Sequence, residues 1–174
     1  MHKLLFLLLL FLCISKANSQ PLPDSTKAQY AAAQNEKERG QCLVAYFKQQ
    51  PLNDATTKAN ALQLKSWFEK QKDATGINYI NLRLAMVLEN NGDFPGALNL
   101  AFSVLPQFEQ RKDSFGILTT YGFISATYMA AKDYLNAAVY SKKEISIVQA
   151  SNDKNKLSSA YNAIACVYGE GNMP

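Results

Sequence analysis

The feature that most constrains this chain is an internal repeat with a period of 40 residues. The segment 72–77 (KDATGI) recurs as 112–117 (KDSFGI), and a weaker copy begins at Asp153. Apolar positions keep the same step, as in Phe68, Phe108 and Val148. Several matching positions in one register indicate a tandem array, in which neighbouring units bury one another's apolar faces.

Each unit is predicted to be a pair of helices. Apolar residues recur at helical spacing over residues 77–88 and again over 97–108. Residues 91–95 (NGDFP) between them supply a glycine stop, the N-cap Asp93 and a first-turn proline. Pro106 is expected to kink the second helix about one turn upstream.

The predicted fold class is all-α, an α-α superhelix or solenoid of antiparallel helix pairs. Residues 20–37 are predicted to be a leader, flexible up to Gln29, with residues 30–38 extending the first helix. The predicted units are 38–76 (a degenerate first repeat), 77–116 and 117–156 (full repeats) and 157–174 (an incomplete repeat).

These units resemble the tetratricopeptide repeat (TPR) family. In that family a small residue of the first helix packs against a small residue of the second, and a large residue follows the first by three places. The matching sets are Ala85, Leu88 and Ala97, then Ser125, Tyr128 and Ala137, and then Ala165 and Tyr168. The resemblance implies that Ala97 and Ala137 are nearly inaccessible. The family period is usually about 34, and helical repeats of the HEAT type, with periods of about 40, are the alternative.

The first residues have the order of a secretory signal peptide. A short basic region at 1–3 precedes an unbroken apolar run at 4–14, and small residues precede an expected cleavage between Ser19 and Gln20. The run has eleven residues, and a membrane span needs about 20. A lipoprotein is disfavoured because Leu12, which is not small, precedes Cys13. The protein is therefore predicted to be exported and periplasmic or otherwise extracytoplasmic.

Composition argues against several classes of function. Without residues 1–19 the chain keeps 16 basic and 14 acidic residues, so it has no basic footprint for nucleic acid. The single histidine, His2, lies in that segment, which leaves no Ser-His or Cys-His pair and no imidazole metal ligand. With no phosphate-binding loop and no paired-cysteine motif, the chain is predicted to be no enzyme, with no metal site and no cofactor.

Cys42 and Cys166 are predicted to lie on first helices about three units apart. That separation exceeds the roughly 7 Å between Cα atoms that a disulfide tolerates. No intramolecular disulfide is therefore expected, and both cysteines are expected to be small buried hydrophobes.

The resemblance implies that the first helices line a concave groove for a protein or peptide. By register, the candidate partner-binding residues are Tyr79, Arg83, Met86, Phe123, Met129 and Asn162. Chaperone-binding members hold a terminal carboxylate with lysines and asparagines, which are replaced here by Leu82, Met86, Gly122 and Ala126. The groove is thus mostly apolar, which favours an extended or helical apolar peptide. Packing against the next unit is the alternative role for these residues.

The last residues, 171–174 (GNMP), are similar to 92–95 (GDFP). A further helix is therefore expected beyond Pro174, the natural protein is expected to be longer, and residues 20–174 are expected to self-associate or to fray at the last helix.

Two functions are consistent with these features. One is an exported repeat scaffold that binds a protein or peptide. The other is the extracytoplasmic sensor region of a membrane-bound histidine kinase or related regulator, which a signal peptide followed by TPR-like repeats resembles. In that case the catalytic or output domain would lie beyond residue 174.

Overall fold

The computed structural model describes residues 22–52, 55–151 and 153–174, and every regular element in these ranges is a helix. The all-α class is thus confirmed. The helices are α2 (Asp24–Ala32), α3 (Glu36–Lys48), α4 (Ala55–Lys70), α5 (Ala74–Asn90), α6 (Phe94–Gln110), α7 (Ser114–Ala130), α8 (Tyr134–Ala150) and α9 (Lys154–Glu170).

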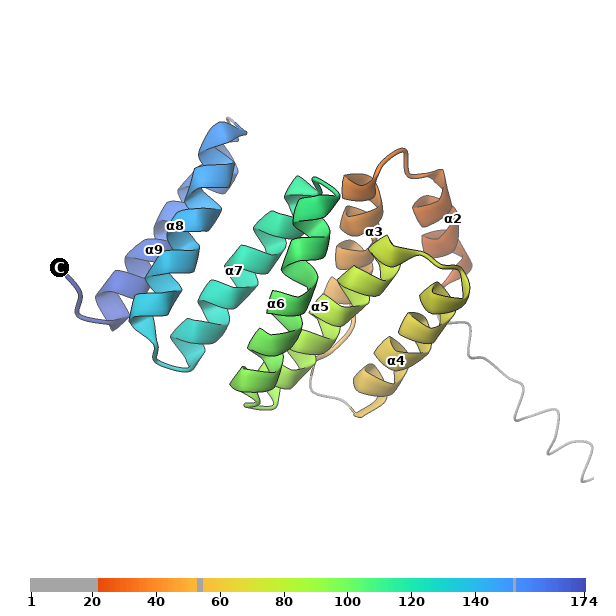
Figure 1. The fold of residues 1–174 in the computed structure, drawn as a ribbon, viewed down its shortest axis with the longest axis horizontal. Helices are drawn as coiled ribbons and strands as arrows, with labels where there is room; N and C mark the ends of the chain where they lie inside the picture. The colour runs from red at the N-terminus through yellow and green to blue at the C-terminus, as the bar shows by residue number, and fades with distance from the viewer. Residues whose placement is uncertain (1–21, 53–54, 152) are drawn as a thin grey trace, which may run out of the picture.

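The helices stand side by side in a row, with α2, α3 and α4 at one end and α8 and α9 at the other (Figure 1). From α4 onward each helix packs against the next one in the chain, and α3 packs against α2, α5 and α7. Neighbours in sequence are therefore mostly neighbours in space. The exception is the set α3, α5 and α7, which meet although other helices separate them in the chain.

One type of turn connects the helices from α4 to α8. The backbone enters the left-handed region at the middle of each three-residue turn, with φ of 55° at Lys72, 80° at Gly92, 56° at Lys112 and 61° at Lys132. The aspartate that follows donates its amide to a carbonyl five residues earlier, as Asp113 N does to Phe108 O over 2.9 Å. This is the Schellman ending of a helix.

The same aspartate begins the next helix. The capping residues of α5 to α9 are Asp73, Asp93, Asp113, Asp133 and Asp153, and each side chain accepts from the amide three residues further on. All five helices have 17 residues. Since one aspartate closes one helix and caps the next, the two halves of each repeat have equal length. The N-cap role predicted for Asp93 is confirmed.

The predicted leader at 20–37 contains a helix. In α2, Tyr30 is buried, and Leu22 just before the helix is buried as well. The chain then breaks at residues 33–35 rather than running on into the next helix, because the Asn35 side chain caps α3 by accepting from Glu38 N over 2.9 Å. The apolar contacts of α2 with α3 were not visible in the repeat pattern.

Two details of helix ends also differ from the sequence prediction. Helix α6 continues through Pro106, which is exposed, to Gln110. At the end of α9, Gly171 has a right-handed conformation and Asn172, with φ of 47°, takes the left-handed place that Gly92 has after α5. The similarity between 92–95 and 171–174 is therefore displaced by one residue, and Met173 takes the place of Asp93.

Small residues allow close approach where the sequence predicted it. Ala97 and Ala137 are fully buried. The glycine of the repeated KDxxG segment has the same cause: a Cβ on Gly116 would lie 2.3 Å from Cδ1 of Phe108, and one on Gly76 would lie 2.1 Å from Cδ1 of Phe68. Each glycine leaves room for the aromatic ring at the end of the preceding helix.

Replacing Gly116 by alanine should therefore destabilise the protein, although alanine is the better helix former. The new methyl group would collide with the buried ring of Phe108, and we expect a loss of about 1–3 kcal/mol in the free energy of unfolding, measured by urea denaturation. The matched control is Gly169→Ala in α9, where nothing lies within 4 Å of the added Cβ. That variant should gain up to about 1 kcal/mol, and equal effects of the two substitutions would contradict this packing.

Candidate functional site

A pocket of about 460 Å³ lies among α3, α5 and α7, the helices that meet despite their separation in sequence. Its walls come from all three helices and from the connection after α3. The lining residues are Val44, Phe47, Lys48, Gln50, Leu52, Tyr79, Leu82, Arg83, Met86, Phe115 and Thr119. We call this hollow the groove pocket. The predicted groove residues Tyr79, Arg83 and Met86 are brought together in it.

Arg83 anchors the connection after α3. Its Nη2 donates to the carbonyl oxygens of Gln50, over 2.8 Å, and of Pro51, over 3.1 Å. Its guanidinium lies 5.5 Å from the centroid of the Phe47 ring. Only 5% of the residue is exposed, and this burial lowers the pKa of Arg83. Arg83 thus has a structural role besides facing the groove pocket.

Tyr79 forms the floor of the groove pocket. It is 1% exposed, and its hydroxyl donates to Oδ2 of Asp113 over 2.8 Å, while Oδ1 of the same carboxylate accepts from the amide of Gly116. Burial first, and then the Asp113 charge, raise the pKa of Tyr79. The ring also needs a glycine on α3, because a Cβ on Gly40 would lie 2.1 Å from Cζ of Tyr79.

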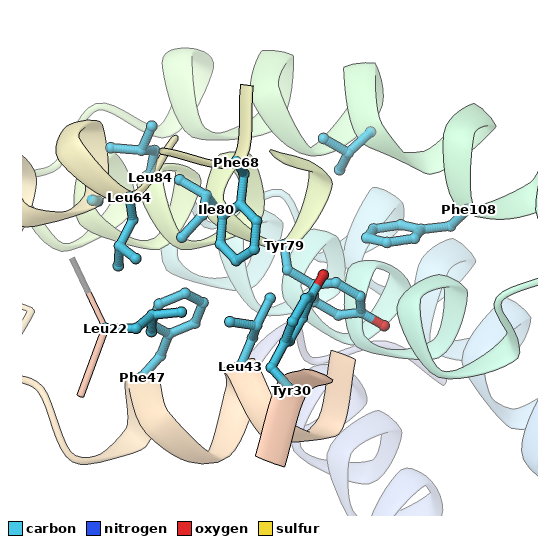
Figure 2. Packing of buried hydrophobic residues seen from close by; sticks show 12 residues of the cluster. Leu22, Tyr30, Leu43, Phe47, Leu64, Phe68, Tyr79, Ile80, Leu84 and Phe108 are labelled. Carbon is cyan, nitrogen blue, oxygen red and sulfur yellow. The ribbon is translucent and has the colours of Figure 1, made fainter. Parts of the chain in front are cut away.

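The same bond recurs one repeat earlier. The Tyr30 hydroxyl donates to Oδ2 of Asp73 over 2.8 Å, and Oδ1 of Asp73 accepts from the amide of Gly76. Burial and this bond raise the pKa of Tyr30. Figure 2 shows Tyr30 and Tyr79 together with the Phe68 and Phe108 rings in the buried cluster that runs under the groove pocket.

The other predicted groove residues lie elsewhere. Phe123 is buried and packs in a cluster with Leu82 and Ala101. Met129 is half-buried near Val167, and Asn162 is exposed on α9. The burial of Tyr79, Arg83 and Phe123 agrees with the alternative that these residues pack against neighbouring units. Of the predicted residues, Met86 is the half-buried one that lines the groove pocket.

Sequence reasoning missed the contribution of α3 and its following connection. Val44, Phe47 and Lys48 line the groove pocket, but the first repeat matches the others weakly, so no register carried them over. Phe47, which lies 40 residues before the buried Val87, is the position from which α3 could have been aligned.

Cys42 is half-buried and Cys166 is exposed, and both are free thiols. The exposure of Cys166 corrects the expectation that both cysteines are buried: no further helix covers that face of α9 in the structure. Within residues 22–52, 55–151 and 153–174, no group of side chains could hold a metal ion. No helix in these same ranges has both the length and the apolar character that crossing a membrane requires.

Comparison with family models, with curated proteins and with solved structures found no match to this chain. The resemblance to the TPR family therefore depends on the residues quoted above.

Substituting Tyr79 by phenylalanine tests the tyrosine–aspartate bond. The change keeps the ring but leaves Oδ2 of the buried Asp113 without its donor, so we expect a loss of about 1–3 kcal/mol in the free energy of unfolding. Tyr161→Phe is the matched control, because Tyr161 is 47% exposed and its hydroxyl accepts from Gln149 at the surface. The control should change stability by less than about 0.5 kcal/mol, and an equally small effect at Tyr79 would contradict the assignment.

Stability should also depend on pH in the alkaline range. The folded protein keeps the protons of Tyr30 and Tyr79, whose pKa values are raised, whereas the unfolded chain releases them above about pH 10. The stabilisation is fully present below that pH and is lost as the pH rises above it. Urea denaturation should give Tyr79→Phe a slope against pH up to about 1.4 kcal/mol per pH unit shallower than that of the wild type. Parallel slopes would contradict this assignment.

Proposed function

We propose that this protein is an exported TPR-like scaffold that binds a protein or peptide through the groove pocket. In this proposal the helices form antiparallel pairs stacked as an α-α superhelix, with α3, α5 and α7 as its inner helices. The observation that supports it most is the origin of the pocket walls, which come from the first helices of three predicted units, 38–76, 77–116 and 117–156. Repeat arrays use such inner surfaces for binding.

The chemistry of the groove pocket favours apolar side chains of a partner. Val44, Leu52 and Met86 are half-buried at its walls, and Lys48 is exposed beside them. An extended or helical peptide would bury its apolar residues against this surface, as other peptides do in helical grooves. The proposal assigns no catalysis, metal, cofactor or nucleic acid to the chain.

Export belongs to the same proposal. It is supported by the order of the first residues, which lie outside the described residues, and by the small residues before the Ser19–Gln20 bond. N-terminal sequencing of the protein recovered from the periplasm would test it, because cleavage there should leave Gln20 as the first residue.

The second candidate is the sensor region of a membrane-bound histidine kinase or related regulator. It is favoured by the combination of a signal peptide with TPR-like repeats of 40 residues. The gene sequence after codon 174 separates the two candidates. An apolar span of about 20 residues after further repeats would favour the sensor, and a polar capping helix followed by a stop codon would favour the free scaffold.

Peptide binding can be tested by selecting random displayed peptides on the full chain and measuring their affinity by fluorescence anisotropy. Met86→Lys places a charge on the wall of the groove pocket and should weaken the selected peptides by about tenfold or more, that is, by about 1.4 kcal/mol. The matched control is Leu135→Lys on α8, where the leucine is 74% exposed and lies outside the groove pocket. Weaker binding to the Leu135 variant alone would place the binding surface elsewhere and contradict the proposal.

A further inference from the structure

Arg83 is a buried cation without a carboxylate partner among the described residues. The two acceptors that it contacts, the carbonyl oxygens of Gln50 and Pro51, are neutral, and Nη2 binds both of them. No acceptor in the described ranges binds its Nη1 or Nε. A charge that is 95% removed from solvent is costly unless it is paired.

The hollow that Arg83 faces has the size of a small-ligand site. Its volume of about 460 Å³ lies within the range of about 300–1,000 Å³ that such sites occupy. Most of its walls are apolar, its second charged residue is the cation Lys48, and no aspartate or glutamate lines it. The walls thus match a ligand that combines an apolar body with one negative charge.

We propose that the groove pocket binds a small amphiphilic carboxylate, with an apolar chain of about ten carbon atoms and its carboxylate paired with Arg83. The planar guanidinium binds a carboxylate through two parallel N–H donors. Nη1 and Nε, which the backbone carbonyls leave unused, are positioned to supply them. The chain lies along Phe47, Leu82 and Met86, and Lys48 attracts the anion to the opening.

This ligand goes beyond the peptide partner proposed above. A peptide ending in a free carboxylate shares the chemistry, but the volume of the groove pocket fits a free small carboxylate. No covalent step is involved, because the ligand is held by burial and charge alone.

Isothermal titration calorimetry of the full chain with decanoate, kept below its micelle concentration, tests the proposal. We expect saturable binding of one decanoate per chain, at least about tenfold tighter than binding of decylamine, which has the same alkyl chain with the opposite charge. Arg83→Lys keeps the charge but loses the planar pair of donors, and it should weaken decanoate by about tenfold.

A second variant tests the location without altering Arg83. Thr119 lines the groove pocket, and Thr119→Trp should fill it and abolish the binding of decanoate. The control is Ser159→Trp, at the register-equivalent position of α9, where the serine is exposed; this variant should bind as the wild type does. If Arg83→Lys does not fold, Thr119→Trp still decides the location.

Three results would overturn the inference: no binding of decanoate, equal binding of decanoate and decylamine, or binding that survives Thr119→Trp. Selected peptides that bind in the Met86-dependent way while decanoate does not would overturn the small-ligand site and leave the proposed function standing. Binding of decanoate without any peptide would have the opposite consequence.

Discussion

The carboxylate of Asp113 joins three parts of the structure. Its amide closes α6, its Oδ1 caps α7 through Gly116, and its Oδ2 accepts the hydroxyl of Tyr79 from α5. A buried carboxylate is tolerated only when hydrogen bonds satisfy it. The position of α5 relative to α7 is therefore coupled to the turn between α6 and α7, and the groove pocket depends on this coupling because both helices form its walls.

The bond recurs between Tyr30 and Asp73, and this recurrence explains why α2 belongs to the fold. Tyr30 joins the start of α5 to a helix that precedes the first predicted repeat, and its ring lies 5.3 Å from that of Phe68. The end of the row near α2 is thereby closed by side chains that cover the first helices. At the α9 end, by contrast, Tyr161 and Cys166 are exposed.

The repeat and its turns could be predicted from the sequence because they depend on local chemistry. The glycine stop, the capping aspartate and the apolar spacing act within a few residues of one another, so Asp93 and the buried Ala97 were located without the structure. The finer 20-residue step of the aspartates was also present in the sequence. It was overlooked because the turns at Asp93 and Asp133 lack the KDxxG pattern found at Asp73 and Asp113.

The roles of the groove residues could not be obtained in this way. Register placed Tyr79 and Arg83 toward the groove, but it could not reveal that Asp113 engages the hydroxyl of Tyr79 or that the backbone after α3 engages Arg83. These contacts join residues more than 30 positions apart, at |i−j| of 34 for Tyr79 and Asp113. They depend on where three helices converge.

The sequence by itself determined the helical class, the length of the repeat and the small residues at the closest helix contacts, because helix periodicity and capping are encoded in neighbouring residues. Only the tertiary structure decided that α2 packs as part of the fold, that α3 meets both α5 and α7, and that Arg83 is buried beside an apolar pocket. The physical reason is that burial and charge pairing depend on distances between helices, which local patterns do not specify.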